Sequence, residues 1–404
     1  MMFSSFKTEY MDSEELRRLV NQIKTLTRGG YDAYDANAKT ILRCLDKILL
    51  RAKEEKEWYL YFRALYYMLY ELNRQGNSDK KILKYAEVFY YDQQLYMDRE
   101  LPNYSNTNMS ETNTDCMDII FSVYRGYCQI QDEKMDDFMR MFEKCALKYG
   151  HEYIYYNALI RLGLLYHDMN MVKKGKENFE KCRCDGCYVC NHYPHFGYYL
   201  MFDDLAGAED LVSRIINKNI AQEYKWCYKY CQRATEKGMY ARILCYCIQL
   251  GKTEMFLDVF ERKGKYLFCE GEDDDDTTYF LFRLCAGDVS GLEDAVKQAV
   301  VDIELEEKQR TSTLGSIYDF LCWYCYFHLL EKSGILKVKV NLGRSDTPRA
   351  DKEGLTKCGE LGTYYERKAD EVGTKFAKSR KMFDYEGLKK SYEECIGIGF
   401  KDVV

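Results

Sequence analysis

Proline is nearly absent from this chain of 404 residues, which contains only Pro102, Pro194 and Pro348. Proteins contain about 5% proline on average, and proline breaks helix interiors because it lacks an amide donor and clashes with the preceding turn. The scarcity argues against a loop-rich β-sandwich and favours long, uninterrupted helices. Runs that alternate apolar and polar residues are also missing from the N-terminal half. The predicted fold class is therefore all-α.

Long apolar runs are missing as well. The most apolar window, 317–330, is 14 residues long and contains Asp319 and His328, whereas a membrane crossing needs about 20 apolar residues. The first ten residues lack the basic start and apolar core of a secretory signal. These absences predict a cytoplasmic protein without a membrane partner. In that compartment most of the 18 cysteines would be reduced thiols that fill the core.

The chain also lacks a strong excess of charge. Its formal net charge is −6, and nucleic-acid binding requires a clustered basic surface, so no nucleic-acid partner is expected. The acidic run 270–276 lacks the alternating ligands of an EF-hand and is interpreted as a solvated loop. The glycine-rich nucleotide-binding patterns, G-x-S-x-G and H-E-x-x-H do not occur. These absences favour a binding protein over an enzyme.

Apolar residues repeat at spacings of three and four through most of the chain, which is typical of amphipathic helices. Residues 1–100 form a predicted N-terminal helical segment, whose first helix is capped by Ser13 and followed by an acidic first turn. The polar stretch 101–114 is the predicted linker. Residues 335–404 form a C-terminal segment. It contains the only alternating octet, 335–342, predicted as one short strand, and a helix that begins near Leu355.

The segment between these two, 115–334, contains helices in closely spaced pairs. In the clearest pair, Leu162, Gly163, Tyr166, Gly175 and Phe179 have the spacing of a tetratricopeptide repeat, in which small residues let two helices approach closely. Further predicted pairs are 195–203 with 206–219, 235–250 with 253–266, and 279–286 with 292–303. Such pairs stack without long-range topology. The predicted architecture is an α-solenoid of stacked helix hairpins of tetratricopeptide type.

A cysteine-rich segment lies after the clearest pair. Residues 182–195 contain four of the 18 cysteines and two of the five histidines. Cys184, Cys187 and Cys190 form two overlapping C-x2-C knuckles, a spacing at which two thiolates bind one tetrahedral ion. More than four candidate ligands are present, including Cys182, His192 and His195, and Cys227 and Cys231 follow the next helix pair. The segment is predicted to bind structural zinc, with core thiols and redox-active thiols as the alternatives.

Several segments together resemble a group of poorly characterised bacterial tetratricopeptide-like proteins from Gram-positive species. The resemblance covers about residues 150–385. The segments that carry it are Cys184-Asp185-Gly186-Cys187, Ala206-Gly207-Ala208-Glu209-Asp210-Leu211, Cys231-Gln232-Arg233-Ala234-Thr235, Ile335 to Leu342, and Tyr364-Tyr365-Glu366-Arg367-Lys368-Ala369. The chain differs from that group after Cys231, where a proline usually follows and this sequence has Arg233-Ala234-Thr235.

The resemblance implies that Cys231 is the partner of the knuckle and that Cys190 or a histidine completes the metal site. The resulting prediction is one structural zinc ion bound by Cys184, Cys187, Cys190 and Cys231, with Cys182, His192 and His195 as substitutes for the fourth ligand. The resemblance also implies a protein or peptide partner, because some such proteins lie beside secreted toxins as immunity proteins and others are peptide-responsive regulators. The alternative function is a thiol-based redox sensor or enzyme that uses the Cys182–Cys190 cluster.

Overall fold

The structure is a computed structural model. It describes residues 13–28, 31–74, 132–148, 150–184, 188–220, 235–269, 277–286, 313–339, 347–380 and 382–398, with four single positions from 81 to 88. These ranges are mostly helical, which confirms the all-α class. The chain divides into two compact units, one that ends at Tyr155 and one that begins at Tyr156. The predicted linker 101–114 lies outside the described residues.

The first unit contains α1 (Glu14–Leu26), α2 (Tyr31–Glu54), α3 (Trp58–Arg74) and α6 (Asp132–Lys148). The side chain of Ser13 accepts a hydrogen bond from the amide of Leu16 at 3.3 Å, which confirms the predicted cap. Helix α1 buries one apolar stripe against α2, and α2 packs against α3. Helix α1 follows the amphipathic pattern closely, whereas α3 is buried on most sides, with the successive residues Leu60, Tyr61 and Phe62 all buried.

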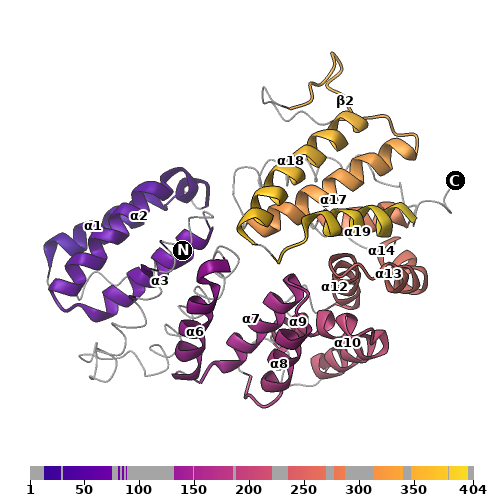
Figure 1. Ribbon diagram of the computed structural model, residues 1–404. Coiled ribbons are helices and arrows are strands. Elements are labelled where there is room, and N and C mark those ends of the chain that lie inside the picture. The colour runs from indigo at the N-terminus through magenta and orange to yellow at the C-terminus, as the bar shows by residue number, and fades with distance from the viewer. Residues whose placement is uncertain are drawn as a thin grey trace. The chain divides into compact units, whose positions relative to one another are not determined.

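The second unit begins with three consecutive helix hairpins. They are formed by α7 (Glu152–Leu165) with α8 (Met169–Phe179), α9 (Tyr188–Met201) with α10 (Leu205–Ile220), and α12 (Glu236–Gln249) with α13 (Thr253–Val259). The last of these helices continues as a π-helix, η5 (Phe260–Gly264), and then as α14 (Lys265–Cys269). In Figure 1, α7, α9 and α12 follow one another in a row, with α8 and α10 along its lower side.

The three hairpins reverse the chain with the same turn. A residue with a positive φ ends the first helix of each: His167 at 53°, Asp203 at 58° and Gly251 at 66°. The amide of the next residue donates to the carbonyl five residues earlier, at 2.8–2.9 Å in all three turns. This is the bond of a Schellman motif, which satisfies carbonyls at the end of a helix. One local geometry is therefore used at three successive positions.

Glycines set the distance between the helices. A Cβ atom on Gly163 would lie 2.6 Å from the side chain of Val172, and one on Gly175 would lie 2.8 Å from Ile160, so α7 and α8 are in backbone contact. On α9, a Cβ at Gly197 would meet Leu164 of α7 at 2.5 Å and Tyr246 of α12 at 3.0 Å. The first helices of the three hairpins therefore pack side by side, as closely as only glycine allows.

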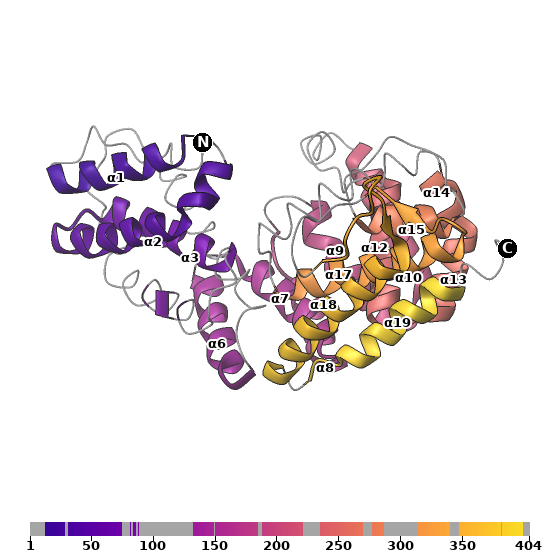
Figure 2. The ribbon, with the colours of Figure 1, turned by 90° about the horizontal axis from the view of Figure 1, so that it is seen from above.

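The C-terminal helices are α15 (Thr277–Cys285), α17 (Thr313–Lys332), α18 (Cys358–Ser379) and α19 (Tyr385–Ile398). Helix α17 packs against α15 and α18, whereas α19 packs against α12 and α13 as well as α17 (Figures 1 and 2). The fully buried guanidinium of Arg380, after α18, donates to the hydroxyl of Tyr166, after α7, at 2.7 Å. The end of the chain thus returns to the earlier hairpins.

The strand prediction needs correction. Of the octet the structure describes residues 335–339, and among these Lys337–Val338 (β1) form a strand that pairs antiparallel with Thr356–Lys357 (β2), which was not predicted. The helix expected from Leu355 begins instead at Cys358. A strand requires a partner for its backbone hydrogen bonds, and the alternating octet carries no information about where the chain returns to supply one.

Two helices also differ from their predicted bounds. Helix α9 begins at Tyr188 and includes Pro194, so Cys190 and His192 lie on a helix instead of on a knuckle loop. The π-helical turn η5 interrupts a segment that was predicted as one regular helix. Across the described helices, α17 with its 20 residues included, none combines the length and apolarity that crossing a bilayer requires.

Candidate functional site

A cavity of about 270 Å³ lies beside α8, α9 and α10 in the second unit. It contains most of the candidate ligands found in the sequence. Its lining consists of Lys176, Phe179, Glu180, Cys182, Cys184, His192, His195, Leu211 and Arg214. The two thiols come from the segment that follows α8, and the two imidazoles come from α9, three residues apart. One turn of α9 thus brings both histidines to the same face of that helix.

His195 is the most unusual residue of the cavity. Its side chain is 1% exposed, and neither ring nitrogen makes a hydrogen bond. Its ring packs edge-on against Phe179, with the centroids 4.5 Å apart, and lies 5.0 Å from the ring of His192. Burial holds the pKa of His195 well below its ordinary value, and the positive charge of Lys176 lowers it further. The imidazole is therefore neutral at physiological pH, with one nitrogen lone pair available.

The two cavity thiols are oriented by asparagines. The side-chain amide of Asn191 donates to the sulfur of Cys184 at 3.0 Å, while the Asn191 carbonyl accepts from the side chain of Asn157 at 2.9 Å. The thiol of Cys182 donates to the carbonyl of Asn178 at 3.2 Å. These bonds link α7, α9 and the end of α8, so the positions of the sulfurs depend on the packing of three helices.

Cys190 lies nearby on α9 but does not line the cavity. Pro194 follows it by four residues and has no amide hydrogen, so the carbonyl of Cys190 lacks its usual helical donor. The next carbonyl of the helix, that of Asn191, accepts from the side chain of Asn157 on α7 at 2.9 Å. Cys190 is therefore not among the thiols that line the cavity.

The cations at the cavity are matched by carboxylates. Lys176 is 7% exposed and pairs with Glu180 at 2.6 Å. Arg214 pairs with Asp210 at 2.7 Å and donates to the hydroxyl of Tyr199 at 3.2 Å. Both ion pairs join residues four apart on one helix, a spacing at which opposite charges meet. The cavity is therefore polar without a large excess of charge.

The structure tests only part of the predicted zinc site. Cys187 and Cys231, and also Cys227, lie outside the described residues. Four of the remaining candidates, Cys182, Cys184, His192 and His195, line one cavity. Within the ranges that the structure describes, no three histidine, cysteine, aspartate or glutamate side chains are close enough to hold a metal ion. The site of Cys184, Cys187, Cys190 and Cys231 stays a prediction.

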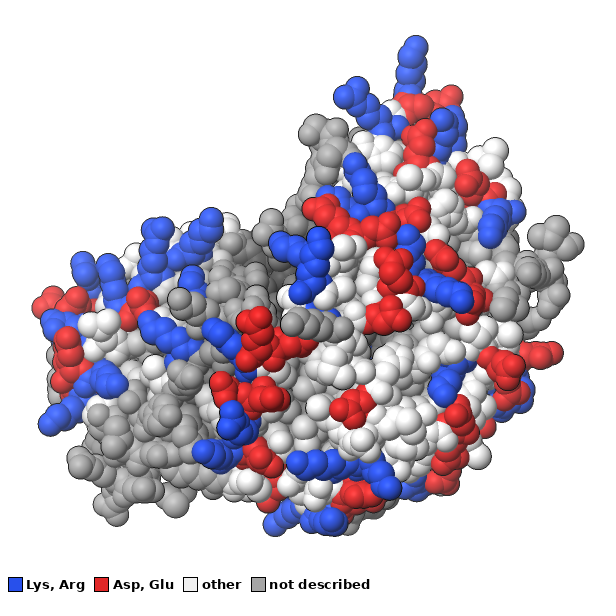
Figure 3. All heavy atoms as spheres, viewed as in Figure 1, with Lys and Arg blue, Asp and Glu red and all other residues white. Residues whose placement is uncertain are grey.

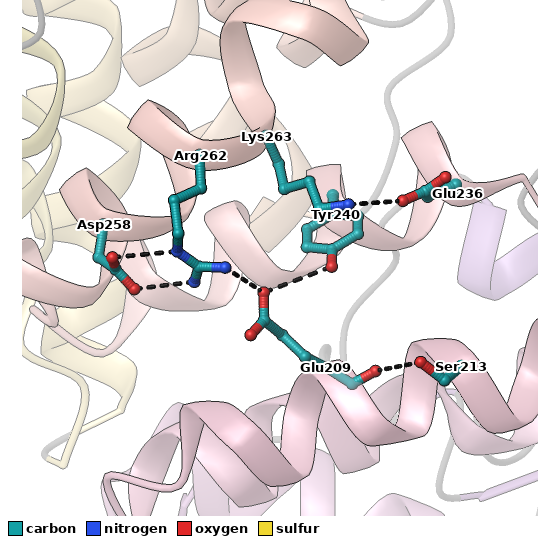
Figure 4. Close-up of polar contacts among 7 residues, drawn as sticks. All are labelled: Glu209, Ser213, Glu236, Tyr240, Asp258, Arg262 and Lys263. Atoms are coloured by element: carbon teal, nitrogen blue, oxygen red, sulfur yellow. Dashed lines mark hydrogen bonds and ion pairs between the residues drawn. The ribbon is translucent and has the colours of Figure 1, made fainter.

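A second group of polar residues joins the hairpins and was missed in the sequence. Figure 4 shows the carboxylate of Glu209 on α10 accepting from Arg262 of η5 at 2.9 Å and from the hydroxyl of Tyr240 on α12 at 3.3 Å. Arg262 also binds both oxygens of Asp258, at 2.8 and 3.0 Å. Burial, followed by the charge of Glu209, raises the pKa of Tyr240 to about 12.

This group extends through Lys263, which pairs with Glu236 at 3.1 Å and lies 5.3 Å from the ring of Tyr240 (Figure 4). The pair Asp258–Arg262 has the i,i+4 spacing that a sequence can reveal. The contacts with Glu209 and Glu236 cross between helices, so no sequence pattern indicates them. A π-helical turn often occurs at functional positions, but here Arg262 joins η5 to α10 of the preceding hairpin and Lys263 joins it to α12 of its own hairpin.

Most of the other described cysteines are buried. A group of six lies where α12, α15, α17 and α19 meet, and consists of Cys245, Cys247, Cys285, Cys322, Cys325 and Cys395. Burial raises the pKa of Cys285 to about 12 and that of Cys395 to about 11. These thiols stay protonated at physiological pH, so they act as small core residues.

Comparison of the chain with protein-family models, with curated proteins and with solved structures finds no match. The resemblance to bacterial tetratricopeptide-like proteins therefore stays a prediction that rests on its own motifs. The cavity residues that sequence reasoning did not assign to the site are Lys176, Phe179, Glu180, Leu211 and Arg214. The i,i+4 pairs of Lys176 with Glu180 and of Asp210 with Arg214 were visible in the sequence, but nothing there placed them beside the thiols.

Proposed function

We propose that this chain is a non-enzymatic helical-repeat protein that captures a protein or peptide partner. The observation that carries the proposal is the repetition of one unit. Three consecutive hairpins have the same turn, with φ of 53°, 58° and 66° at the reversal, and they stack in the same order. Stacked hairpins form extended surfaces that suit the binding of elongated partners.

We infer further that these hairpins are degenerate repeats of tetratricopeptide type in an α-solenoid. In support, α9 packs against both its own partner α10 and the preceding α8, and α12 packs against both α9 and α10. Each hairpin therefore contacts the next through both of its helices. The return of α19 onto α12 and α13 closes the array at its C-terminal end, the position at which repeat proteins carry a cap.

The surface that we assign to the partner lies along the first helices of the hairpins. Arg242 on α12 is half-buried, and its guanidinium lies 5.3 Å from the ring of Tyr193 on α9 and 5.8 Å from that of Tyr246. Both tyrosines are buried and hold the guanidinium in place, whereas arginine at a protein surface is enriched in interfaces. On the face shown in Figure 3, basic and acidic side chains are interspersed, which suits recognition by paired charges.

The test uses the full chain as bait in an extract of its host, followed by an affinity measurement on the recovered and purified partner. Arg242→Ala is expected to weaken binding at least tenfold, since a buried interface arginine contributes roughly 2 kcal/mol or more. Lys263→Ala is the matched control: it also removes a cation that lies over a tyrosine ring, but from η5. It should leave the affinity within about twofold.

Equal affinity of the wild type and Arg242→Ala would contradict the assigned surface. Failure to recover any saturable partner would contradict the proposed function itself. An immunity role predicts in addition that the partner is a toxin whose activity the chain suppresses at equimolar ratio. A regulatory role predicts a short peptide instead.

The second candidate function is a thiol-based redox sensor. It is favoured by one observation, that Cys182 and Cys184 are half-buried in a cavity beside two imidazoles, whereas the cysteines at the junction of α12, α15, α17 and α19 are mostly fully buried. Reactive cysteines are partly exposed and lie in polar surroundings. Rapid formation of a reversible sulfenic acid or disulfide at these two residues at low peroxide concentration would support this function, and inertness would exclude it.

A further inference from the structure

The cavity beside α8, α9 and α10 has a composition that the binding function does not explain. Four of its nine lining residues are thiols or imidazoles. A peptide-binding surface has no need of a fully buried histidine, and burial of two ring nitrogens without any hydrogen-bond partner is costly. Such a residue persists where a ligand supplies the missing partner.

We propose that this cavity is a zinc site whose ligands are Cys182, Cys184, His192 and His195. Two cysteines and two histidines form one of the common ligand sets of tetrahedral structural zinc. Two thiolates balance the charge of the ion, and neutral imidazoles supply the other two bonds. This set differs from the one predicted in the sequence, because it excludes Cys190 and needs neither Cys187 nor Cys231.

The histidines are arranged for shared coordination. His192 and His195 lie one helical turn apart on α9, with their ring centroids 5.0 Å apart, and the ring of Phe179 packs edge-on against both. Phe179 thereby covers one side of the imidazoles, and their other side faces the cavity. Neither ring nitrogen of His195 makes a hydrogen bond, so a nitrogen atom is available to bind an ion.

The thiols must turn to complete the site, because in the arrangement described here no three ligand side chains converge on one point. Both sulfurs lie on the segment that follows α8, where the backbone is not helical. The thiol of Cys182 donates to the carbonyl of Asn178, and the sulfur of Cys184 accepts from the side-chain amide of Asn191. In the zinc-bound state each cysteine would rotate about χ1 and exchange these contacts for metal bonds.

An anion is the competing occupant, since Lys176 and Arg214 also line the cavity. Both cations are already paired, Lys176 with Glu180 at 2.6 Å and Arg214 with Asp210 at 2.7 Å. An anion would have to displace a carboxylate from each, and Glu180 would repel it from within the cavity. The thiols and imidazoles therefore point to a soft cation. With four protein ligands the ion would be structural, joining the end of α8 to α9.

The experiment measures metal binding by the full chain. Protein purified without chelator is expected to contain about one equivalent of zinc. After removal of the metal, titration with Co²⁺ should give intense visible bands of tetrahedral cobalt together with a near-ultraviolet thiolate-to-cobalt band. Competition with a chelator of known affinity then gives the dissociation constants for zinc and cobalt.

The variants separate the two ligand sets. His195→Gln and Cys184→Ser should each lower the affinity for zinc by more than 10–100-fold, the loss that is typical when a residue that contacts a metal ligand is removed. Cys182→Ser should reduce the thiolate band by about half. Cys190→Ser and His328→Gln are the matched controls and should change neither affinity nor spectrum. Circular dichroism verifies the fold of each variant, and His192→Gln replaces His195→Gln if the latter does not fold.

Three results would overturn the proposal. The first is the absence of zinc together with an octahedral cobalt spectrum. The second is loss of metal in Cys190→Ser with retention in His195→Gln and Cys182→Ser, which would assign the ion to the overlapping C-x2-C knuckles. The third is stabilisation of the metal-free protein by inorganic phosphate or sulfate, but not by zinc, which would identify an anion site.

Discussion

Two regions of the second unit are rich in cysteine, and they differ in nearly every physical property. The cavity thiols, Cys182 and Cys184, lie on a non-helical segment beside charged side chains and imidazoles. The core thiols lie on helices and are mostly buried: Cys247 and Cys395 have no exposed surface. The same residue type therefore serves as a candidate ligand in one place and as a small apolar side chain in the other.

The difference follows from solvation. In the core, burial raises the pKa of the thiols, and neighbouring thiols such as Cys245 beside Cys247 raise it further. The positive charges of Lys252 near Cys247 and of Lys332 near Cys325 lower the pKa only slightly compared with the effect of burial. At the cavity, carboxylates, cations and amides surround the sulfurs, so charge can be accommodated. Cysteine counts alone cannot distinguish these cases, because the chemistry depends on what surrounds each sulfur.

The largest expected effect comes from placing a charge in each region. Cys247→Asp should destabilise the second unit by about 3–5 kcal/mol, because it buries a carboxylate without a partner. Cys184→Asp, beside Lys176 and Arg214, should cost less than about 1 kcal/mol. Urea unfolding of the metal-free protein, followed by circular dichroism, measures both. Similar losses for the two variants would mean that the regions do not differ in solvation.

The second effect concerns reactivity. Iodoacetamide reacts with thiolates, and the raised pKa values of Cys285 and Cys395, about 12 and 11, lower their thiolate fractions roughly 100- to 1,000-fold relative to a free thiol. In metal-free protein at pH 8, Cys182 and Cys184 should be modified first, and the core thiols only through unfolding. Mass spectrometry of peptides over time measures the order. Modification of Cys285 as early as Cys182 and Cys184 would contradict the expected difference in reactivity between core and cavity thiols.

The third effect is loss of stability at alkaline pH. A core thiol whose pKa is raised from about 8.5 to about 11 stays protonated in the folded protein while the unfolded chain loses the proton. The unfolded state then binds fewer protons, so stability falls by about 1.4 kcal/mol per pH unit for each such thiol between those values. Below pH 8 this contribution is constant. Urea unfolding under reducing conditions from pH 7 to pH 10 should show the decrease.

Cys395→Ala tests the origin of that decrease, since it removes one of the thiols. The slope above pH 9 should become less steep by about one thiol's contribution, whereas Cys184→Ala should leave it unchanged. Identical slopes in all three proteins would assign the alkaline transition to tyrosines instead.

The smallest expected effect is an increase in the free energy of unfolding, whereas most substitutions of a buried residue decrease it. His195→Phe should stabilise the metal-free protein by about 1 kcal/mol, because it replaces two buried nitrogens that lack partners with apolar atoms. In the presence of zinc the wild type should be the more stable of the two proteins, because zinc binding stabilises the wild type but not the variant. Thermal unfolding of both proteins with and without zinc measures the two differences. A destabilised variant under both conditions would show that His195 has a packing role alone.

The comparison also shows which parts of the structure were predictable. The cap of α1 by Ser13 and the close approach at Gly163 and Gly175 followed from local spacing, because both depend on residues within one or two helices. The bounds of α9 did not follow. The predicted helix began at residue 195, whereas α9 begins at Tyr188, includes Pro194 and receives a hydrogen bond from Asn157 on α7.

The residue types of the candidate site could be predicted from the sequence, but not which cysteines and histidines lie together. The density of cysteine and histidine in residues 182–195 marked the region, and the C-x2-C spacing favoured Cys187 and Cys190. The structure assembles a different group around the cavity, since α9 carries His192 and His195 toward the thiols after α8. Spacing along the chain predicts the distance between two side chains only if the backbone conformation between them is known. A loop was expected around Cys190, but this residue lies on a helix.

The sequence by itself determined the helical class, the caps and the glycine contacts, because each of these depends on interactions between residues close along the chain. Tertiary structure alone decided that β1 finds its partner at Thr356–Lys357, that α19 returns to α12 and α13, and that Arg380 reaches Tyr166 across 214 positions. It also decided which thiols are buried and which share a cavity with imidazoles. Burial and the approach of distant side chains arise from the packing of whole helices, and no local pattern encodes that packing.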